Sequence, residues 1–198
     1  RLAYTWNLPT GSFSVGGFLL NMRRGQVGSN DVGDAVALPG PTDRFRDFGV
    51  DSSYMYINGD HAITLDGLYV HESQRLDATW GGGGSDHLHD TLQSLNLKGS
   101  YWYRHTYGVT LASFVYNGSK DATLYGNDGS PNTQGESIEL DYSPFGQSHS
   151  WQQPWANVRL GLEYTWFNRF SGRVHNVDGA GRNAHDNNTL YLYVWLAI

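Results

Sequence analysis

The chain has 198 residues, a formal net charge of −6 and only Lys98 and Lys120 as lysines, which argues against a nucleic-acid partner because such a surface needs a basic stripe. It has no cysteine, which excludes disulfides, thiolate metal sites and, within this chain, the Cys-x-x-Cys-His attachment of a c-type haem. The mean hydropathy is −0.49 and no apolar run reaches the ~20 residues of a membrane helix, but a membrane β-barrel is still compatible because only every second strand residue meets lipid.

The first half of the chain predicts two hairpins. Their tight turns are signalled by Pro9-Thr10-Gly11 and by Asn58-Gly59-Asp60, the strongest turn signal in the sequence. Apolar and polar side chains alternate on both sides of each turn, whereas polar segments without periodicity predict long loops at residues 23–46 and 74–90. The strands expected from this pattern are residues 2–8, 12–21, 47–57 and 61–72.

The second half predicts five further strands. The clearest alternation in the chain is at residues 92–104. In the next strand, Asn117-Gly118 falls inside an extended run and predicts a bulge. The expected strands are residues 92–104, 109–125, 136–145, 156–170 and 187–198, separated by a short turn at 105–108 and by connections at 126–135, 146–154 and 171–186.

The last strand contains no Gly, Pro or charge. Positions 190, 192, 194, 196 and 198 place aliphatic side chains on one face, with Tyr191, Tyr193 and Trp195 on the other. In a soluble fold such an uncapped strand is an aggregation hazard unless both faces are covered, whereas in a membrane barrel lipid covers one face. Bacterial outer-membrane proteins end in a similar strand, with Phe or Trp preferred where this chain has Ile198.

These patterns predict an all-β fold, either an antiparallel transmembrane β-barrel or the C-terminal part of one, as a single domain over residues 1–198. The expected strands number about nine and have roughly 10 to 15 residues, long for soluble sheets but suited to tilted membrane-crossing strands. Long and short connections alternate, as in barrels with periplasmic turns and external loops. Because bacterial barrels have an even strand number, an odd count predicts at least one further strand before Arg1.

Charged and aromatic side chains are expected to have separate places on these strands. Exposing a basic side chain at mid-membrane costs roughly 2–4 kcal/mol, so charges should face the lumen, where they either tune a pore or pair across strands and fill a narrow barrel. Aromatic rings near strand ends predict interfacial belts, with ordinary sheet packing as the alternative. The lumen-facing candidates are Asp66, Lys98, Arg104, Glu139, Asp141, Arg159, Glu163 and Arg169. The belt candidates are Trp6, Tyr54, Tyr56, Tyr101, Tyr103, Tyr164, Trp166 and Trp195.

We expect neither a metal site nor a catalytic site. His87-Leu88-His89 beside Asp86 and Asp90 can place two imidazoles at a strand end, but a third ligand at a fixed spacing is missing. Residues 178–188 are rich in Asp, Asn and Gly but lack the spacing of a calcium loop. The candidate catalytic pairs are Ser85 with His87 and Asp186 with His185, and neither pair lies within a motif.

Two parts of the chain resemble a known group of proteins. The segment beginning Val158-Arg159-Leu160-Gly161-Leu162-Glu163-Tyr164, continued by residues 178–197, resembles the end of proteobacterial outer-membrane barrel proteins grouped with c-type cytochromes. The stretch from residues 76–79 to 124–126 is similar to their middle section. The resemblance implies a barrel that sheathes a haem protein and carries electrons across the outer membrane. No cofactor is expected in this chain, so any haem would belong to a c-type cytochrome partner or to another segment.

Three functions remain open from the sequence. The first is an outer-membrane barrel acting as a channel or sheath, including the barrel component of a cytochrome-based electron conduit. The second is a passive diffusion porin for small solutes, which shares the fold. The third is a soluble β-sheet protein that binds carbohydrate through exposed aromatic side chains. The first two imply location in the bacterial outer membrane with lipid as a partner, and none requires an enzyme.

Overall fold

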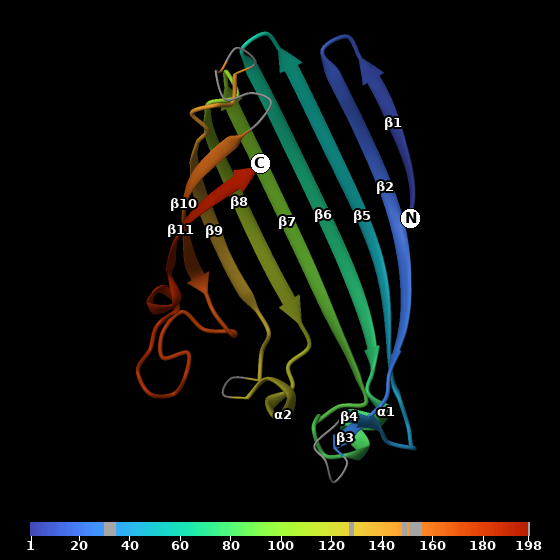
Figure 1. Ribbon diagram of the computed structural model, residues 1–198. Helices are drawn as coiled ribbons and strands as arrows, with labels where there is room; N and C mark the ends of the chain where they lie inside the picture. The colour runs from blue at the N-terminus through green and yellow to red at the C-terminus, as the bar shows by residue number, and fades with distance from the viewer. Residues whose placement is uncertain (30–34, 127–128, 148–149, 151–155, 198) are drawn as a thin grey trace.

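The computed structural model describes residues 1–29, 35–126, 129–147, 150 and 156–197. They form a nine-stranded antiparallel sheet in which each strand pairs with the next one along the chain, interrupted by the small ribbon β3–β4 (Figure 1). Among these residues no helix is long and apolar enough to cross a membrane. The sheet strands are β1 Leu2–Leu8, β2 Gly11–Arg24, β5 Asp43–Asn58, β6 His61–Arg75, β7 His89–Tyr103, β8 Tyr107–Gly118, β9 Thr133–Tyr142, β10 Asn157–Arg169 and β11 Thr189–Ala197. The smaller elements are β3 Val27–Ser29, β4 Ala35–Ala37, α1 Asp77–Gly81, α2 Ala122–Tyr125 and the 3₁₀ helix η1 Ala184–Asn187.

The predicted all-β antiparallel fold is confirmed. One predicted strand boundary, at the end of β8, is wrong and concerns the residues that begin α2. The strand expected to reach residue 125 ends at Gly118, so the bulge predicted at Asn117-Gly118 is wrong. Asp121 instead begins α2, because its carboxylate accepts a hydrogen bond from the backbone N–H of Leu124 at 2.7 Å. Parts of the expected loop 23–46 and of the connection 146–154, and also Ile198, lie outside the described residues.

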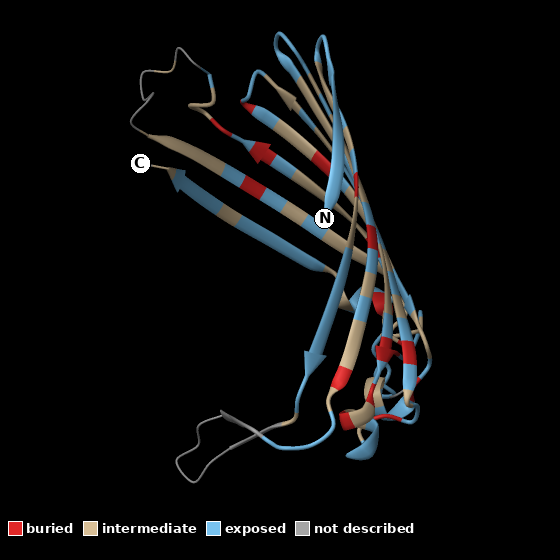
Figure 2. Cartoon of the chain, turned by 90° about the vertical axis from the view of Figure 1, so that its right-hand side faces the viewer, coloured by how far each residue is buried: buried red, intermediate tan, exposed pale blue. Residues whose placement is uncertain are grey.

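The sheet is open within the described residues. Strands β1 and β11 each have one neighbour and form its two edges, so the closed barrel considered from the sequence is not present in this part of the chain. The sheet is strongly curved, and β10 and β11 diverge from the direction of the earlier strands (Figure 2). What the structure supports is one continuous curved wall of nine strands.

This wall is a single layer. Each of the nine strands contacts its sheet neighbours, and no second sheet packs on either face in the described structure. The buried apolar side chains found there, Leu76, Ala78, Val177 and Ala184, all lie in connections between the nine strands. Apolar strand residues are instead exposed, for example Leu19 at 80% and Leu192 at 72%. The sheet therefore has no protein core of its own.

The two ends of the sheet differ. The tight turns β1–β2, β5–β6 and β7–β8 lie at one end, the turn end, and α1, α2 and β3–β4 lie at the other, the loop end (Figure 1). The predicted alternation of short and long connections holds for these elements. One connection at the turn end is long, because β9 ends at Tyr142 and β10 begins at Asn157.

Candidate functional site

The strand register separates the sheet into a polar face and an apolar face. Residues directly opposite each other on paired strands point to the same side, so a row can be followed across all nine strands. One row has polar or small side chains at every position: Thr5, Ser14, Ser53, Asp66, Lys98, Ala112, Ser137, Thr165 and Thr189. The adjacent row, one residue away along each strand and on the other face, is Trp6, Phe13, Tyr54, Leu65, Gly99, Leu111, Ile138, Tyr164 and Leu190.

The polar face is the more crowded of the two. Every strand residue that is buried in the described structure shares the register of the polar row. These residues are Gly16, Asp43, Gly49, Gln74, Asp90, Thr110, Gly135, Asp141 and Gly161. Because side chains converge on the inside of a curved sheet and spread apart on the outside, this crowding indicates that the polar face is the concave one.

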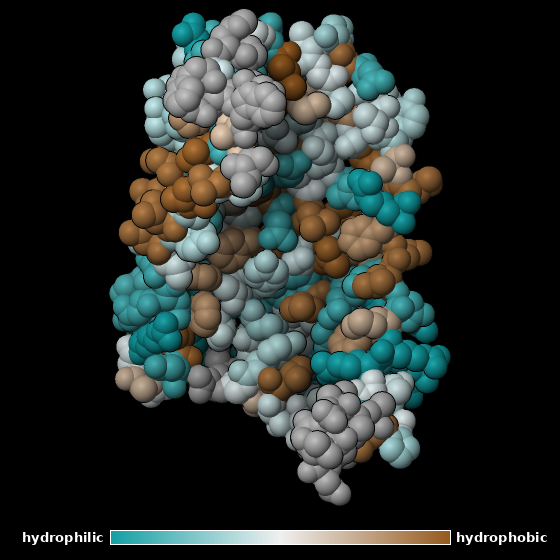
Figure 3. Space-filling view, in the orientation of Figure 1, coloured by the Kyte–Doolittle hydropathy of each residue, from teal (hydrophilic) through white to brown (hydrophobic). Residues whose placement is uncertain are grey.

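Aromatic rings gather on the apolar face at the turn end. Trp6 stacks on Phe13 with ring centroids 5.5 Å apart, and Tyr107 stacks on Tyr142 at the same separation. His61 stacks on Tyr101 and shares a 2.8 Å hydrogen bond with its hydroxyl group. Figure 3 looks onto the opposite, concave side of the sheet, where hydrophobic side chains are most frequent at mid-height and hydrophilic ones towards the loop end.

Seven of the eight belt candidates lie on the apolar face. Trp6, Tyr54, Tyr56, Tyr101 and Tyr103 are near the turn end, and Tyr164 and Trp166 are further along β10 towards the loop end. Trp195 is the exception, because it pairs directly with Arg159 on the polar face. Tyr107 and Tyr142 belong to the aromatic group at the turn end and were not selected from the sequence, since their pairing depends on the register of β8 with β9.

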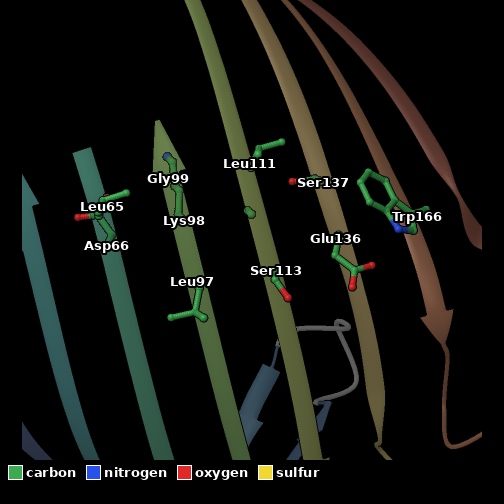
Figure 4. A pocket seen from close by; sticks show the side chains of 11 residues that line it. Leu65, Asp66, Leu97, Lys98, Gly99, Leu111, Ser113, Glu136, Ser137 and Trp166 are labelled. Carbon is green, nitrogen blue, oxygen red and sulfur yellow. The ribbon is translucent and has the colours of Figure 1, made fainter. Parts of the chain in front are cut away.

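A shallow groove crosses the apolar face between β6 and β10. Leu65, Leu97, Leu111 and Trp166 supply its apolar lining, and Figure 4 shows these side chains on neighbouring strands. The groove exists because Gly99 has no side chain between Leu65 and Leu111, its direct partners on β6 and β8. Glu136 at its margin accepts a 2.6 Å hydrogen bond from the Asn168 side chain.

On the polar face, a charged cluster joins β9, β10 and β11. Arg159 donates from Nε and Nη2 to the two carboxylate oxygens of Asp141 at 2.7 and 2.8 Å, and from Nη2 to Glu139 at 3.1 Å. The Tyr193 hydroxyl donates to Glu139 and, at 2.9 Å, to Asp141. A two-pronged arginine–carboxylate contact fixes geometry as well as charge, so this cluster holds the last three strands in register.

Aromatic rings lie close over glycines on the same face. The Arg159 guanidinium is 5.1 Å from the Trp102 ring centre and 5.7 Å from that of Tyr193. A Cβ on Gly161 would lie 2.2 Å from the Tyr193 ring, and one on Gly108 would lie 2.7 Å from Trp102. Cross-strand aromatic–glycine pairs of this kind pin register. The pairs found are Phe18–Gly49, Trp102–Gly108, Phe114–Gly135 and Tyr193–Gly161.

Six of the eight lumen-facing candidates share the polar face: Asp66, Lys98, Glu139, Asp141, Arg159 and Glu163. Asp66 and Lys98 are direct cross-strand partners. The other two candidates, Arg104 and Arg169, do not lie on the polar face. Arg104 lies in the β7–β8 turn, where its Nε donates to Asp60 at 2.8 Å. Arg169 follows an irregularity in β10 and pairs with Gln134, whose position belongs to the apolar face.

The apolar face ends in a cationic row at the loop end. Arg23 is directly opposite Arg44, Arg44 is opposite Arg75, and Arg75 is opposite His89. Arg75 has an acidic partner, because its Nε donates to Asp77 at 3.0 Å. The Nε of Arg44 is buried without a hydrogen-bond partner in the described structure. Like charges directly opposite each other are destabilising, so this row favours an anionic surrounding.

A polar cluster at the loop end joins the β6–β7 connection to the residues before α2. The Asp121 carboxylate accepts hydrogen bonds from the Ser85 hydroxyl and from the backbone N–H groups of Asp86, His87 and Leu124. Burial opposes ionisation, but these hydrogen bonds outweigh it and lower the pKa of Asp121 from its usual value. Asp121 is the residue near His87 and Asp90 that sequence spacing did not reveal.

Neither candidate catalytic pair forms a nucleophile–base arrangement. The Ser85 hydroxyl contacts the carbonyl oxygen and the backbone N–H of His87, together with Asp121, rather than the His87 ring. His185 lies 3.3 Å from Asp186, and both side chains are exposed. A serine nucleophile needs its proton accepted by a base, and the Ser85 geometry directs that proton elsewhere.

The chain matches no protein-family model, no curated protein and no solved structure in comparisons with known proteins.

Proposed function

We propose that this chain forms part of the wall of an integral bacterial outer-membrane β-barrel that acts as a channel or sheath. The supporting observation is the pair of adjacent rows that cross all nine strands. The row from Trp6 to Leu190 contains only aliphatic residues, aromatic residues and glycine, and the row from Thr5 to Thr189 contains only polar or small residues. A sheet with one continuous apolar face and no covering layer is stable when hydrocarbon replaces a protein core.

The height of the apolar band supports this proposal. On β6 it lies between His61 and His71, a span of ten residues in these numbers, or about 33 Å at ~3.3 Å per residue. A strand tilted by about 40° would project this span onto about 25 Å, the usual height of the lipid-facing band of outer-membrane barrels. The aromatic group at the turn end and the cationic row at the loop end would then meet the two headgroup layers.

The polar face is proposed to line the lumen. Small hydroxyl side chains and pairs such as Asp66 with Lys98 suit contact with water, which would serve a diffusion porin. A sheath for a c-type cytochrome is the more specific alternative, motivated by the sequence resemblance. In both cases the edges β1 and β11 must gain partners, because an unpaired edge is not stable in hydrocarbon.

Purification of the native complex tests the proposal. We expect the chain in the outer-membrane fraction, released only by detergent. Haem absorbance in the visible spectrum of the purified complex would support the sheath, and conductance across a planar bilayer by haem-free protein would support the porin. Recovery of the chain without detergent, as for a soluble carbohydrate-binding protein, would contradict both.

A further inference from the structure

The strongest unassigned feature is a group of three side chains at the loop end. One ligand atom each from His87, Asp90 and Asp121 lies within 4.8 Å of the other two. His87 comes from the β6–β7 connection, Asp90 from the start of β7 and Asp121 from the residue before α2. The group therefore bridges two connections that are far apart in the sequence.

Asp90 is a buried carboxylate without a hydrogen bond in the described structure. Its side chain is 1% exposed, yet neither of its carboxylate oxygens has a hydrogen-bond partner within the part of the chain that the structure describes. One of these oxygens is 3.7 Å from Nδ1 of His87, too long for a hydrogen bond. A buried carboxylate with no partner is costly, and a bound cation would offset that cost.

The other two side chains complete a set of donors around Asp90. The Asp121 side chain is fully buried and its Oδ2 is 3.8 Å from Nδ1 of His87. Oδ2 already accepts hydrogen bonds from the Ser85 hydroxyl and from the N–H groups of Asp86 and His87. Oδ1 accepts one hydrogen bond, from the Leu124 N–H, and keeps a second lone pair available for a metal ion. The His87 side chain is 56% exposed, so the group is open to solvent on that side, where water can complete a coordination shell.

The spacing and the donor types match a divalent transition-metal ion. Two ligands at ~2.1 Å from a tetrahedral Zn²⁺ are about 3.4 Å apart, close to the 3.7 Å between the His87 nitrogen and the Asp90 oxygen. Imidazole favours Zn²⁺ over the alkaline-earth ions, and carboxylates are accepted by both classes. We propose that His87, Asp90 and Asp121 bind a divalent transition-metal ion of the Zn²⁺ class, which clamps the β6–β7 connection to the start of α2.

Calorimetric titration of the full chain in detergent tests this proposal. After treatment with EDTA and its removal, ZnCl₂, MnCl₂ and CaCl₂ are titrated separately. We expect saturable binding of one Zn²⁺ per chain, weakened roughly tenfold or more by His87→Ala, because loss of even an outer-shell partner costs about 10- to 100-fold. Asp90→Asn should weaken binding at least as much.

His89→Ala is the matched control. His89 is also exposed and lies two residues further on, but it is directly opposite Arg75 on the apolar face, so its replacement should leave Zn²⁺ binding unchanged. The proposal is overturned if the unaltered chain binds none of the three ions saturably, or if only Ca²⁺ binds and His87→Ala has no effect. Because His87 is exposed, its variant should fold even if Asp90→Asn does not. These outcomes do not depend on membrane location and therefore test the metal site separately from the proposed function.

Discussion

Individual carboxylates organise the loop end. Asp43 begins β5, and its Oδ1 accepts hydrogen bonds from the backbone N–H groups of Ala78 and Thr79 at 2.8 and 3.0 Å. Asp86 accepts in the same way from Ala122 and Thr123. The first N–H groups of a helix have no partners within the helix itself. Each of these acids accepts hydrogen bonds from such N–H groups at the start of a short helix. The same chemistry recurs in the last long connection.

Asp178 gives a pH prediction for that connection. Its Oδ1 accepts hydrogen bonds from the backbone N–H groups of Ala180 and Arg182 at 2.8 and 3.1 Å, and these bonds lower the pKa of Asp178. A lowered pKa means that the stabilisation is fully present above the unfolded value of about 3.9 and is lost as the pH falls through the folded value. We expect an NMR titration of the Ala180 and Arg182 amides to show a midpoint below about 3.9.

The control for this titration is Asp178→Asn, which removes the ionising group and should abolish the transition in both amides. A midpoint at or above the ordinary aspartate value in the unaltered chain would show that the two hydrogen bonds do not favour the charged form.

At the scale of the strands, register is held by pairs that only the folded sheet brings together. Gly161 on β10 lies beneath the Tyr193 ring of β11, and the Tyr193 hydroxyl bonds to Glu139 and Asp141 on β9. We predict that Gly161→Ala displaces this ring, breaks these hydrogen bonds and lowers the free energy of unfolding by roughly 1–3 kcal/mol, as measured by urea titration in detergent.

Gly17→Ala is the matched strand control. A Cβ at Gly17 would meet no atom nearer than 3.6 Å, so this substitution should have little effect. If Gly161→Ala is as mild as Gly17→Ala, the Tyr193 ring does not help to fix the register of the last strands.

The strands were predictable because alternation and turn residues are local signals. The Asn58-Gly59-Asp60 turn and the alternation around Leu95 and Leu97 needed no knowledge of tertiary structure. The helix α2 was missed because its four residues, Ala122–Tyr125, are too few to show a helical period, and its start depends on Asp121 and on the distant Asp86. Helix capping by residues far apart in the sequence leaves no periodic pattern.

The face on which a candidate residue lies was predictable only where side chains alternate regularly between the two faces along its own strand. Trp195 alternates with Val194 and Leu196, so its place opposite the apolar face follows from its own strand. Arg169 was misplaced because an irregularity near the end of β10 reverses parity. Asp121 could not be joined to His87 and Asp90, because that contact depends on how two connections fold against each other.

At the scale of the whole molecule, the curved wall has two unpaired edges. Strands β1 and β11 each offer one row of backbone groups to a further strand. The proposed barrel requires these edges to be paired. It also requires hydrocarbon on the apolar face, which is the central claim.

Site-specific labelling measures that claim most directly, because the chain has no cysteine and single cysteines can be introduced without background. Leu111 and Ile138 lie in the apolar row, while their chain neighbours Ala112 and Ser137 lie in the polar row. Each position is changed to cysteine, labelled with an environment-sensitive fluorophore and reconstituted in vesicles containing lipids brominated on their acyl chains. We predict quenching by the brominated chains at 111 and 138, and quenching only by a water-soluble quencher at 112 and 137. Equal quenching of all four labels by either agent would contradict a wall with lipid on one face and water on the other.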